Sequence, residues 1–222
     1  MTSRTTLFAP LPPTSALSAS ARSTSALPAS ALPASAVSAA VLAASLLGAA
    51  LPAAEANAAS YVADPAGSKL EFVGVQAGAE FTGGFHKYTA AIDFAPDALA
   101  TAHFDVQIDL TSVDSKDKDR DQTIRGTDIF DVAHYPTAHY ITKTITKTAT
   151  GFSATGSLTL RGVTKDVPID FQFVSTGPQA KLDGTAKLKR LDFGVGQGDW
   201  KSTEWVADAV KINFSLQLKP KP

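Results

Sequence analysis

The sequence of residues 60–222 predicts an all-β fold: an antiparallel barrel or sandwich of about eight strands with one or two short helices. Three observations predict it. Apolar and polar residues alternate with a period of two, so successive side chains point to opposite faces of a sheet. Turn residues such as Gly and Pro-Asp separate the alternating runs at short intervals. Helix-like sequence is confined to two short stretches.

The predicted elements follow one another with little sequence between them. Strands are expected, in order, at residues 68–75, 81–94, 102–110, 138–148, 152–160, 167–173, 185–193 and 210–218. In residues 102–110, for example, Phe104, Val106 and Ile108 alternate with Asp105 and Gln107. Helices are expected at residues 116–129 and 202–207. A closed barrel of this size leaves a space that side chains fill or that one small ligand occupies.

The first 58 residues differ from the rest. Residues 2–38 are almost all Ser, Ala, Pro, Thr and Leu, which is low-complexity sequence. Residues 37–51 form an uncharged apolar run, shorter than the ~20 residues of a membrane span and typical of a signal-peptide core. Ala56-Asn57-Ala58 supplies a small-x-small cleavage site. We therefore expect a leader and signal peptide at 1–58 and a periplasmic or secreted domain at 59–222. An uncleaved anchor and a start codon downstream of Met1 are the alternatives.

Composition narrows the functional classes. The formal charge is −1 with no basic stripe, so no nucleic-acid partner is expected. The absence of cysteine excludes a disulfide framework and thiolate catalysis. His86, His103, His134 and His139 lack the spacing of metal ligands, and no G-x-S-x-G elbow is present. We expect no cofactor, no metal and no enzymatic activity.

The stretch DFGVGQGDW raises the question of a nucleotide-binding loop. Its glycines, Gly194, Gly196 and Gly198, occur at every second position, whereas a dinucleotide loop needs G-x-G-x-x-G followed by a helix. No long helix follows, and the other kinase motifs are missing. Glycines within a β-region mark a bulge or a close backbone approach. We expect an irregular barrel edge here, with Trp200 and Trp205 folding over an opening.

A second stretch imitates a calcium loop. Asp117, Asp119 and Asp121 have the spacing of its first ligands, but Gln122 stands where the loop needs Gly and Asp128 where it needs Glu. The interleaved basic residues would also repel the ion. A solvated, charged start of a helix is therefore the prediction.

Several motifs together resemble the YceI-like family of secreted lipid-binding proteins. The pattern R-D-x-x-[LI]-R-x-x-D-x-F-D-V-x-x-[YF]-P is met by residues 120–136, and G-x-L-T-[IL]-x-G-V-T-K by residues 156–165. RLDFGVGQGDW continues the resemblance in the same order, over nearly all of residues 59–222. The D-F-G-V-G-Q-G-[DE]-W form resembles a subgroup whose relatives occur fused to, or encoded beside, a di-haem membrane cytochrome of the b561 type.

The resemblance implies an extended lipocalin-like barrel enclosing a long apolar lipid of the isoprenoid type: a quinone, a prenyl pyrophosphate, or a fatty amide or acid. It also implies a homodimer and a membrane-cytochrome partner as further associations. The apolar candidates for ligand binding are Phe72, Phe94, Phe104, Ile108, Phe130, Phe171, Phe173, Phe193, Trp200 and Trp205. Arg125 and Arg161 are candidates for a polar head, with ion pairs to Asp121, Asp128 or Asp166 as the alternative.

Two other functions compete with lipid carriage or sequestration. One is an assembly module for the membrane cytochrome, with a barrel filled by its own side chains. The other is a lipid-modifying enzyme, although no nucleophile–base pair is recognisable in the sequence.

Overall fold

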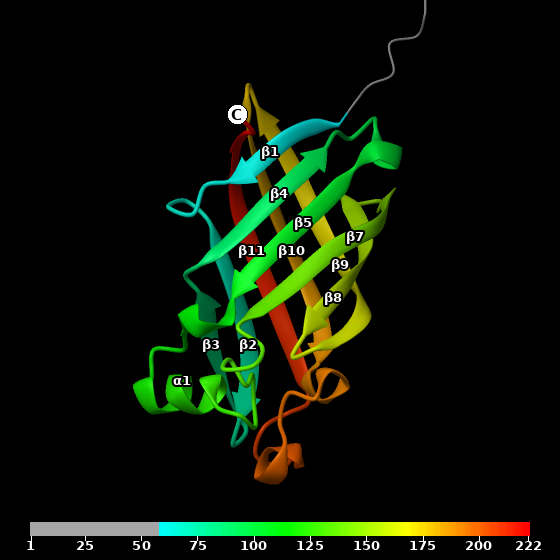
Figure 1. The fold of residues 1–222 in the computed structure, drawn as a ribbon. Coiled ribbons are helices and arrows are strands. Elements are labelled where there is room, and N and C mark those ends of the chain that lie inside the picture. The colour runs from blue at the N-terminus through cyan, green and yellow to red at the C-terminus, as the bar shows by residue number, and fades with distance from the viewer. Residues whose placement is uncertain (1–57) are drawn as a thin grey trace, which may run out of the picture. The chain divides into compact units, whose positions relative to one another are not determined.

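The computed structural model describes residues 58–222, which form a closed antiparallel barrel with a smaller sheet attached to it (Figure 1). The all-β prediction is confirmed. The leader predicted at residues 1–58 lies, except for Ala58, outside the described residues. Within residues 58–222, no helix has both the length and the apolar character needed to cross a membrane.

The barrel contains eight of the strands, and it closes because β1 pairs with β4 on one side and with β11 on the other. In order around the barrel, the strands are β1 (Ala59–Ala63), β4 (Tyr88–Phe94), β5 (His103–Asp109), β7 (Thr137–Lys147), β8 (Phe152–Leu160), β9 (Val163–Thr176), β10 (Gln179–Lys189) and β11 (Ala209–Pro220). Closure leaves the barrel without an unpaired edge at β1 and β11.

The smaller sheet extends one end of the barrel. It consists of β2 (Lys69–Gln76), β3 (Ala79–Phe85) and the two-residue β6 (Val113–Asp114). β2 pairs with residues 211–215 of β11, whereas β1 pairs with residues 218–220 of the same strand. The helix α1 (Lys118–Arg125) follows β6 and lies at that same end (Figure 1).

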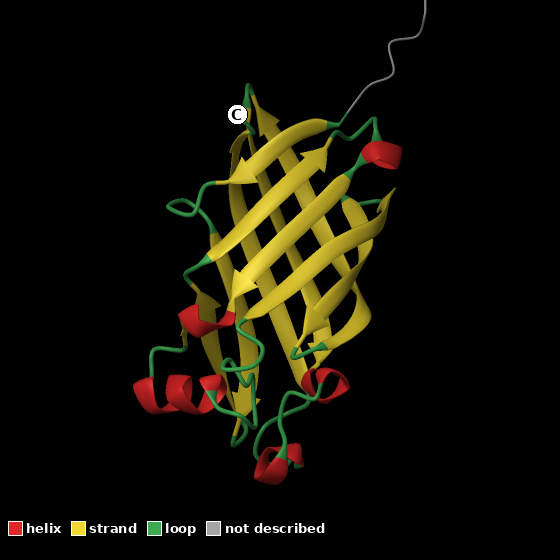
Figure 2. Ribbon diagram, viewed as in Figure 1, coloured by secondary structure: helices red, strands yellow, loops and turns green. Residues whose placement is uncertain are grey.

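Short 3₁₀ turns occupy the ends of the barrel strands (Figure 2). They are η1 (Leu99–Thr101), η2 (Leu110–Ser112), η3 (Arg190–Phe193) and η4 (Gly198–Lys201). Of these, η2, η3 and η4 lie at the end that carries α1 (Figure 1). We call this end the α1 end of the barrel.

The structure corrects several predicted elements. The strand expected at 81–94 is two strands, because β3 leaves to pair with β6 while β4 joins β5. The first helix is shorter than 116–129 and stops before Gly126. The helix expected at 202–207 is wrong: Val206 bridges to Gln76, and the helical turn precedes it in η4. β1 carries too short an alternation to be predicted.

Aromatic packing fills the barrel at the end opposite α1. Phe94 is completely buried, and its ring lies 4.8–5.9 Å, centroid to centroid, from those of Phe104, Phe152, Phe171 and Phe173. We call these five residues the aromatic plug. Tilted and edge-to-face pairs of this kind each add ~0.5–1.5 kcal/mol to simple burial. The plug is therefore a concentrated source of stability at one end of the barrel.

We predict that Phe94→Ala lowers the free energy of unfolding by about 3–5 kcal/mol, because it empties the centre of the plug. Urea denaturation measures this change. Val174→Ala is the control, since Val174 is a hydrophobic residue 58% exposed, and its loss should cost less than about 0.5 kcal/mol. Equal effects of the two substitutions would contradict a plug centred on Phe94.

Candidate ligand-binding cavity

The α1 end of the barrel is hollow. A cavity of about 530 Å³ lies between the barrel strands, β2, β3 and α1, within the ~300–1,000 Å³ range typical of ligand pockets. Its wall is mostly aliphatic and aromatic. The apolar lining comprises Leu70, Phe72, Phe81, Phe85, Tyr88, Ile92, Phe104, Val106, Ile108, Leu110, Ile124, Ile129, Phe130, Ala138, Tyr140, Leu158, Leu160, Val167, Ile169, Leu182, Ala186, Leu188, Val195, Trp200, Val206, Ala207, Val210, Ile212, Phe214 and Leu216.

Strand β11 shows how the filling changes along the barrel. Its inward residues at the α1 end, Val210, Ile212 and Phe214, line the cavity and are only partly buried. Further along the same face, Leu216 is buried and still borders the cavity, and Leu218 is buried outside the lining. One continuous run of alternating residues thus passes from cavity wall, through Leu216, to packed core at Leu218.

Glycines opposite phenylalanines keep bulky rings against the wall. Phe72 pairs in register with Gly83, and Phe81 pairs with Gly74. A Cβ placed on Gly74 would come within 2.8 Å of the Phe81 ring, and one on Gly83 would overlap the Phe72 ring. Each ring therefore occupies the space that a cross-strand side chain would fill, as with edge glycines covered by aromatic residues.

Four polar lining residues lie where the wall reaches solvent. Asp117, which caps α1, and Asp119 and Thr123 within it are exposed, and Gln76 at the end of β2 is partly exposed. These residues mark the mouth of the cavity. Beside them, Arg120 holds its guanidinium 4.4 Å from the centre of the Phe81 ring, so its charge caps the apolar wall.

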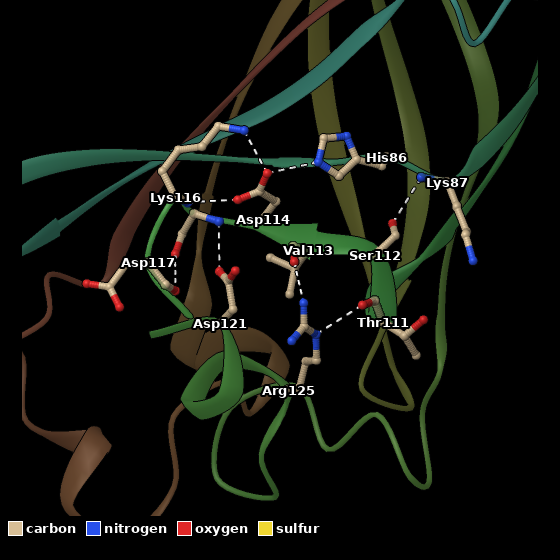
Figure 3. A network of polar contacts seen from close by, with 11 residues as sticks. His86, Lys87, Thr111, Ser112, Val113, Asp114, Lys116, Asp117, Asp121 and Arg125 are labelled. Carbon is tan, nitrogen blue, oxygen red and sulfur yellow. Dashed lines mark hydrogen bonds and ion pairs between the residues drawn. The ribbon is translucent and has the colours of Figure 1, made fainter. Parts of the chain in front are cut away.

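Hydrogen bonds fix the start of α1 against the smaller sheet (Figure 3). The Asp117 carboxylate accepts the backbone N–H groups of Asp119 and Arg120, and buried Asp121 accepts from the Ser115 N–H at 2.7 Å. Asp114 accepts from Lys116 Nζ at 2.6 Å and contacts His86 Nε2 at 3.0 Å. The hydrogen bonds from Lys116 and His86 hold the pKa of Asp114 well below its usual range. The predicted charged helix start is confirmed, and it is solvated at Asp117 and Asp119 but not at Asp121, which is buried.

Arg190 explains the glycine run that follows it. Its guanidinium is buried and donates to four backbone carbonyls, those of Val195, Ser202, Val206 and Ala207, at 2.9–3.1 Å. Burial lowers the pKa of this guanidinium, and the nearby Asp208 carboxylate opposes the shift. One side chain therefore holds together the segment that carries η4 and walls the cavity mouth.

Gly196 leaves room for the Arg190 guanidinium. Its φ is +105°, and a Cβ at this position would overlap Arg190 Nη1 and approach the Trp200 carbonyl oxygen to 2.9 Å. Gly194, with φ of +67°, ends η3 in the left-handed conformation. The irregular edge predicted for this stretch is thus a loop wrapped around a buried cation.

Residues 61–218 match the sequence profile of the YceI-like domain. The chain belongs to the YceI-like family. A UPF0312 protein of Vibrio parahaemolyticus is 32% identical over 169 residues, which cover 70% of this chain and 89% of that protein. The crystal structure of BcnA from Burkholderia cenocepacia has a TM-score of 0.66 at 34% identity, covering 70% of this chain and 98% of that one.

A more distant structure agrees in fold alone. The polyisoprenoid binding domain from Saccharophagus degradans has a TM-score of 0.57 at 19% identity, over 74% of this chain and 99% of that one. The lipocalin-like barrel expected of a YceI-like domain is therefore found both in this protein and in the solved neighbours.

The YceI-like domain places five of the apolar candidates in the cavity wall: Phe72, Phe104, Ile108, Phe130 and Trp200. The remaining five lie elsewhere. Phe94, Phe171 and Phe173 belong to the plug, Phe193 is buried in η3, and Trp205 is 69% exposed outside the lining. Their roles toward a ligand stay predictions. Alternation shows which face a phenylalanine occupies, but not which half of the barrel is filled.

Neither predicted head-binding arginine lies in the cavity lining. Arg125 donates to the carbonyls of Thr111 and Val113, and Arg161 to those of Gly194 and Thr127. Both arginines therefore brace loops at the α1 end. Instead of forming the alternative ion pairs with Asp121, Asp128 or Asp166, they bind backbone oxygens.

Sequence reasoning missed the polar groups that do reach the cavity. Arg120 and Arg190 contribute to its lining, as do the rings of Tyr88 and Tyr140. Burial raises the pKa of both tyrosines, so their hydroxyls remain neutral, and Tyr140 donates to the Val167 carbonyl at 3.2 Å. The glycines spaced after Arg190 were the available signal, since they indicate close packing around one residue.

We predict that Gly196→Ala destabilises the domain more than Gly177→Ala, by about 1–3 kcal/mol, because it displaces buried Arg190 donors from their carbonyls. Gly177 is the matched control: its φ is also positive, at +63°, but a Cβ there would meet nothing within 4 Å. Urea denaturation measures both. Equal losses would show that backbone conformation alone matters at Gly196.

Proposed function

We propose that this YceI-like protein binds a long apolar lipid of the isoprenoid type in its barrel, for carriage or sequestration outside the cytoplasm. The observation that carries the proposal is the half-hollow barrel, open at the α1 end and closed by the aromatic plug. The ligand class covers quinones, prenyl pyrophosphates and fatty amides or acids. Its tail lies among the apolar side chains of the cavity, and its head lies at the mouth.

The free energy of such binding comes from the tail. Each CH₂ group removed from water contributes ~0.8 kcal/mol, so ten buried carbons contribute about 8 kcal/mol before ordering costs. A micromolar dissociation constant corresponds to ~8.2 kcal/mol. Ten carbons therefore fall just short of a micromolar constant even before those costs, so the proposal requires a tail longer than ten carbons.

The lining favours binding over the competing functions. Among the described residues that form the cavity wall there is no serine, histidine or lysine, the residue types that supply most nucleophile–base pairs. A barrel that served only as an assembly module would be packed throughout, whereas this one is packed at the plug end alone. Partnership with a di-haem membrane cytochrome and homodimer formation stay predictions.

Two further observations support the proposal. The Saccharophagus degradans neighbour is described as a polyisoprenoid binding domain, and its barrel is similar to this one. The apolar run at residues 37–51 and the Ala-Asn-Ala motif before residue 59 support export to the periplasm or beyond. Export would bring the protein to a compartment between or outside membranes, where a free lipid tail needs a carrier.

Native mass spectrometry of protein purified without added lipid tests the proposal directly. We expect a mass increment that organic extraction removes and that matches an isoprenoid-type or fatty lipid. Mass spectrometry of the same sample identifies the N-terminus and so tests cleavage after Ala58. An empty protein that also takes up no quinone, prenyl or fatty analogue would overturn lipid binding.

Filling the cavity should abolish uptake. Ala186 lines the cavity and pairs in register with Ile169 and Ile212, so Ala186→Phe projects a ring into the space for the tail. We predict at least a tenfold loss of affinity for a prenyl analogue, equivalent to ~1.4 kcal/mol. Thr185→Phe is the matched control, because Thr185 is exposed on the opposite face of the same strand. Undiminished binding by a folded Ala186→Phe variant would place the ligand elsewhere.

A further inference from the structure

The mouth of the cavity carries one large apolar side chain that packs into neither the core nor the cavity wall. Trp205 is 69% exposed, more than any other large hydrophobic residue among the described ones. Its neighbour Val206 lines the cavity and bridges to Gln76 at the mouth, so Trp205 lies at the edge of the opening. The same end of the barrel carries α1, η4 and the turn between β2 and β3 (Figure 1).

Trp205 projects from a fixed part of the chain. Its carbonyl accepts the N–H of Ala77 at 2.7 Å, and Val206 forms an antiparallel bridge with Gln76. Arg190 donates to the Val206 carbonyl at 2.9 Å. These bonds attach the segment to the exposed Ala77–Gly78 turn of the β2–β3 hairpin and to the buried guanidinium. Exposure of the indole is therefore built into the rim.

We propose that Trp205 and the Ala77–Gly78 turn dock the protein on the surface of a lipid bilayer, with the cavity mouth facing the membrane. The indole enters the headgroup region, where its apolar ring and polar N–H are both accommodated. The proposal rests on the proposed function, lipid binding, because that function gives docking its purpose. When the mouth faces the membrane, a ligand that passes from the bilayer to the cavity exposes less of its tail to water.

The size of this surface favours a membrane over a protein partner. A stable protein interface buries ~800 Å² on each side, whereas one tryptophan supplies ~150–250 Å². Ala77 and Gly78 add almost no side-chain area. A single interfacial tryptophan suits weak, reversible contact with a bilayer, which is what repeated loading and unloading requires.

The charge around Trp205 specifies the kind of membrane contact. The exposed ionisable residues of the hairpin and of residues 198–206 are Glu80, Asp199, Lys201 and Glu204, which carry three negative charges and one positive charge. The start of α1 adds two exposed cations, Lys116 and Lys118, and two exposed anions, Asp117 and Asp119, so the balance stays negative. Such a rim gains nothing from anionic headgroups, unlike the basic clusters that bind acidic lipids. Docking should therefore occur on zwitterionic vesicles, and anionic lipid should weaken it at low salt.

The chain has two tryptophans, so replacing one of them lets fluorescence emission report on the other alone. In the Trp200→Phe variant, Trp205 is the single indole. We expect phosphatidylcholine vesicles to blue-shift its emission, and lipids brominated near the headgroup to quench it. The experiment uses the protein in the form purified from cells, with its N-terminus identified by mass spectrometry. Unchanged emission on saturating vesicles, or contact that only anionic vesicles support and salt abolishes, would overturn the proposal.

Lipid transfer supplies the functional readout. Trp205→Ser should slow uptake of a prenyl analogue from vesicles about tenfold, while uptake of the same analogue from dilute ethanol stays unchanged, because the cavity is intact. Val174→Ser is the matched control, since Val174 is also exposed but lies outside the α1 end, on β9. Equal transfer rates for the Trp205 and Val174 variants would overturn the proposal. Failure of all uptake, with Trp205 still quenched by vesicles, would reject the carrier function and leave the docking surface supported.

Discussion

The packing of four aromatic rings around Phe94 is the interaction on which the rest of the structure depends. A barrel gains most of its stability from burying the side chains inside it, and a hollow interior gives up part of that gain. Here Phe104, Phe152, Phe171 and Phe173 surround Phe94 at one end and make that end a compact core. The other end can then remain open, because the strands that form its wall continue into the plug.

The open end needs support of a different kind, and arginine side chains supply it. Arg190 is surrounded by backbone carbonyls, and Arg125 and Arg161 join neighbouring loops in the same way. A guanidinium carries five N–H donors in a fixed plane, so one side chain can fix several turns of irregular chain. The loops around the mouth thus acquire defined positions without filling the space that they surround.

Sequence periodicity predicted the fold because alternation is a local property. Each strand face could be read from residues such as Phe104, Val106 and Ile108, and the turn residues gave the strand ends approximately. The split after Phe85 could not be read, because it depends on β3 leaving to pair with β6. The distribution of phenylalanines between plug and cavity also depends on register across distant strands, so Phe94, in the plug, and Phe130, in the cavity wall, looked equivalent in the sequence.

The candidate site was predictable in kind but not in its polar details. An apolar interior followed from the alternation of apolar and polar residues, whereas the choice among arginines required the positions of backbone carbonyls. Arg125 and Arg161 were the head-binding candidates in the sequence, yet each donates to two carbonyl oxygens, and the arginines at the cavity are Arg120 and Arg190. Arg190 already donates to four carbonyls, and Arg120 lies against Phe81. With its cations so engaged, the cavity offers a ligand mainly hydrocarbon contact, so tail length should influence affinity more than the chemistry of the head.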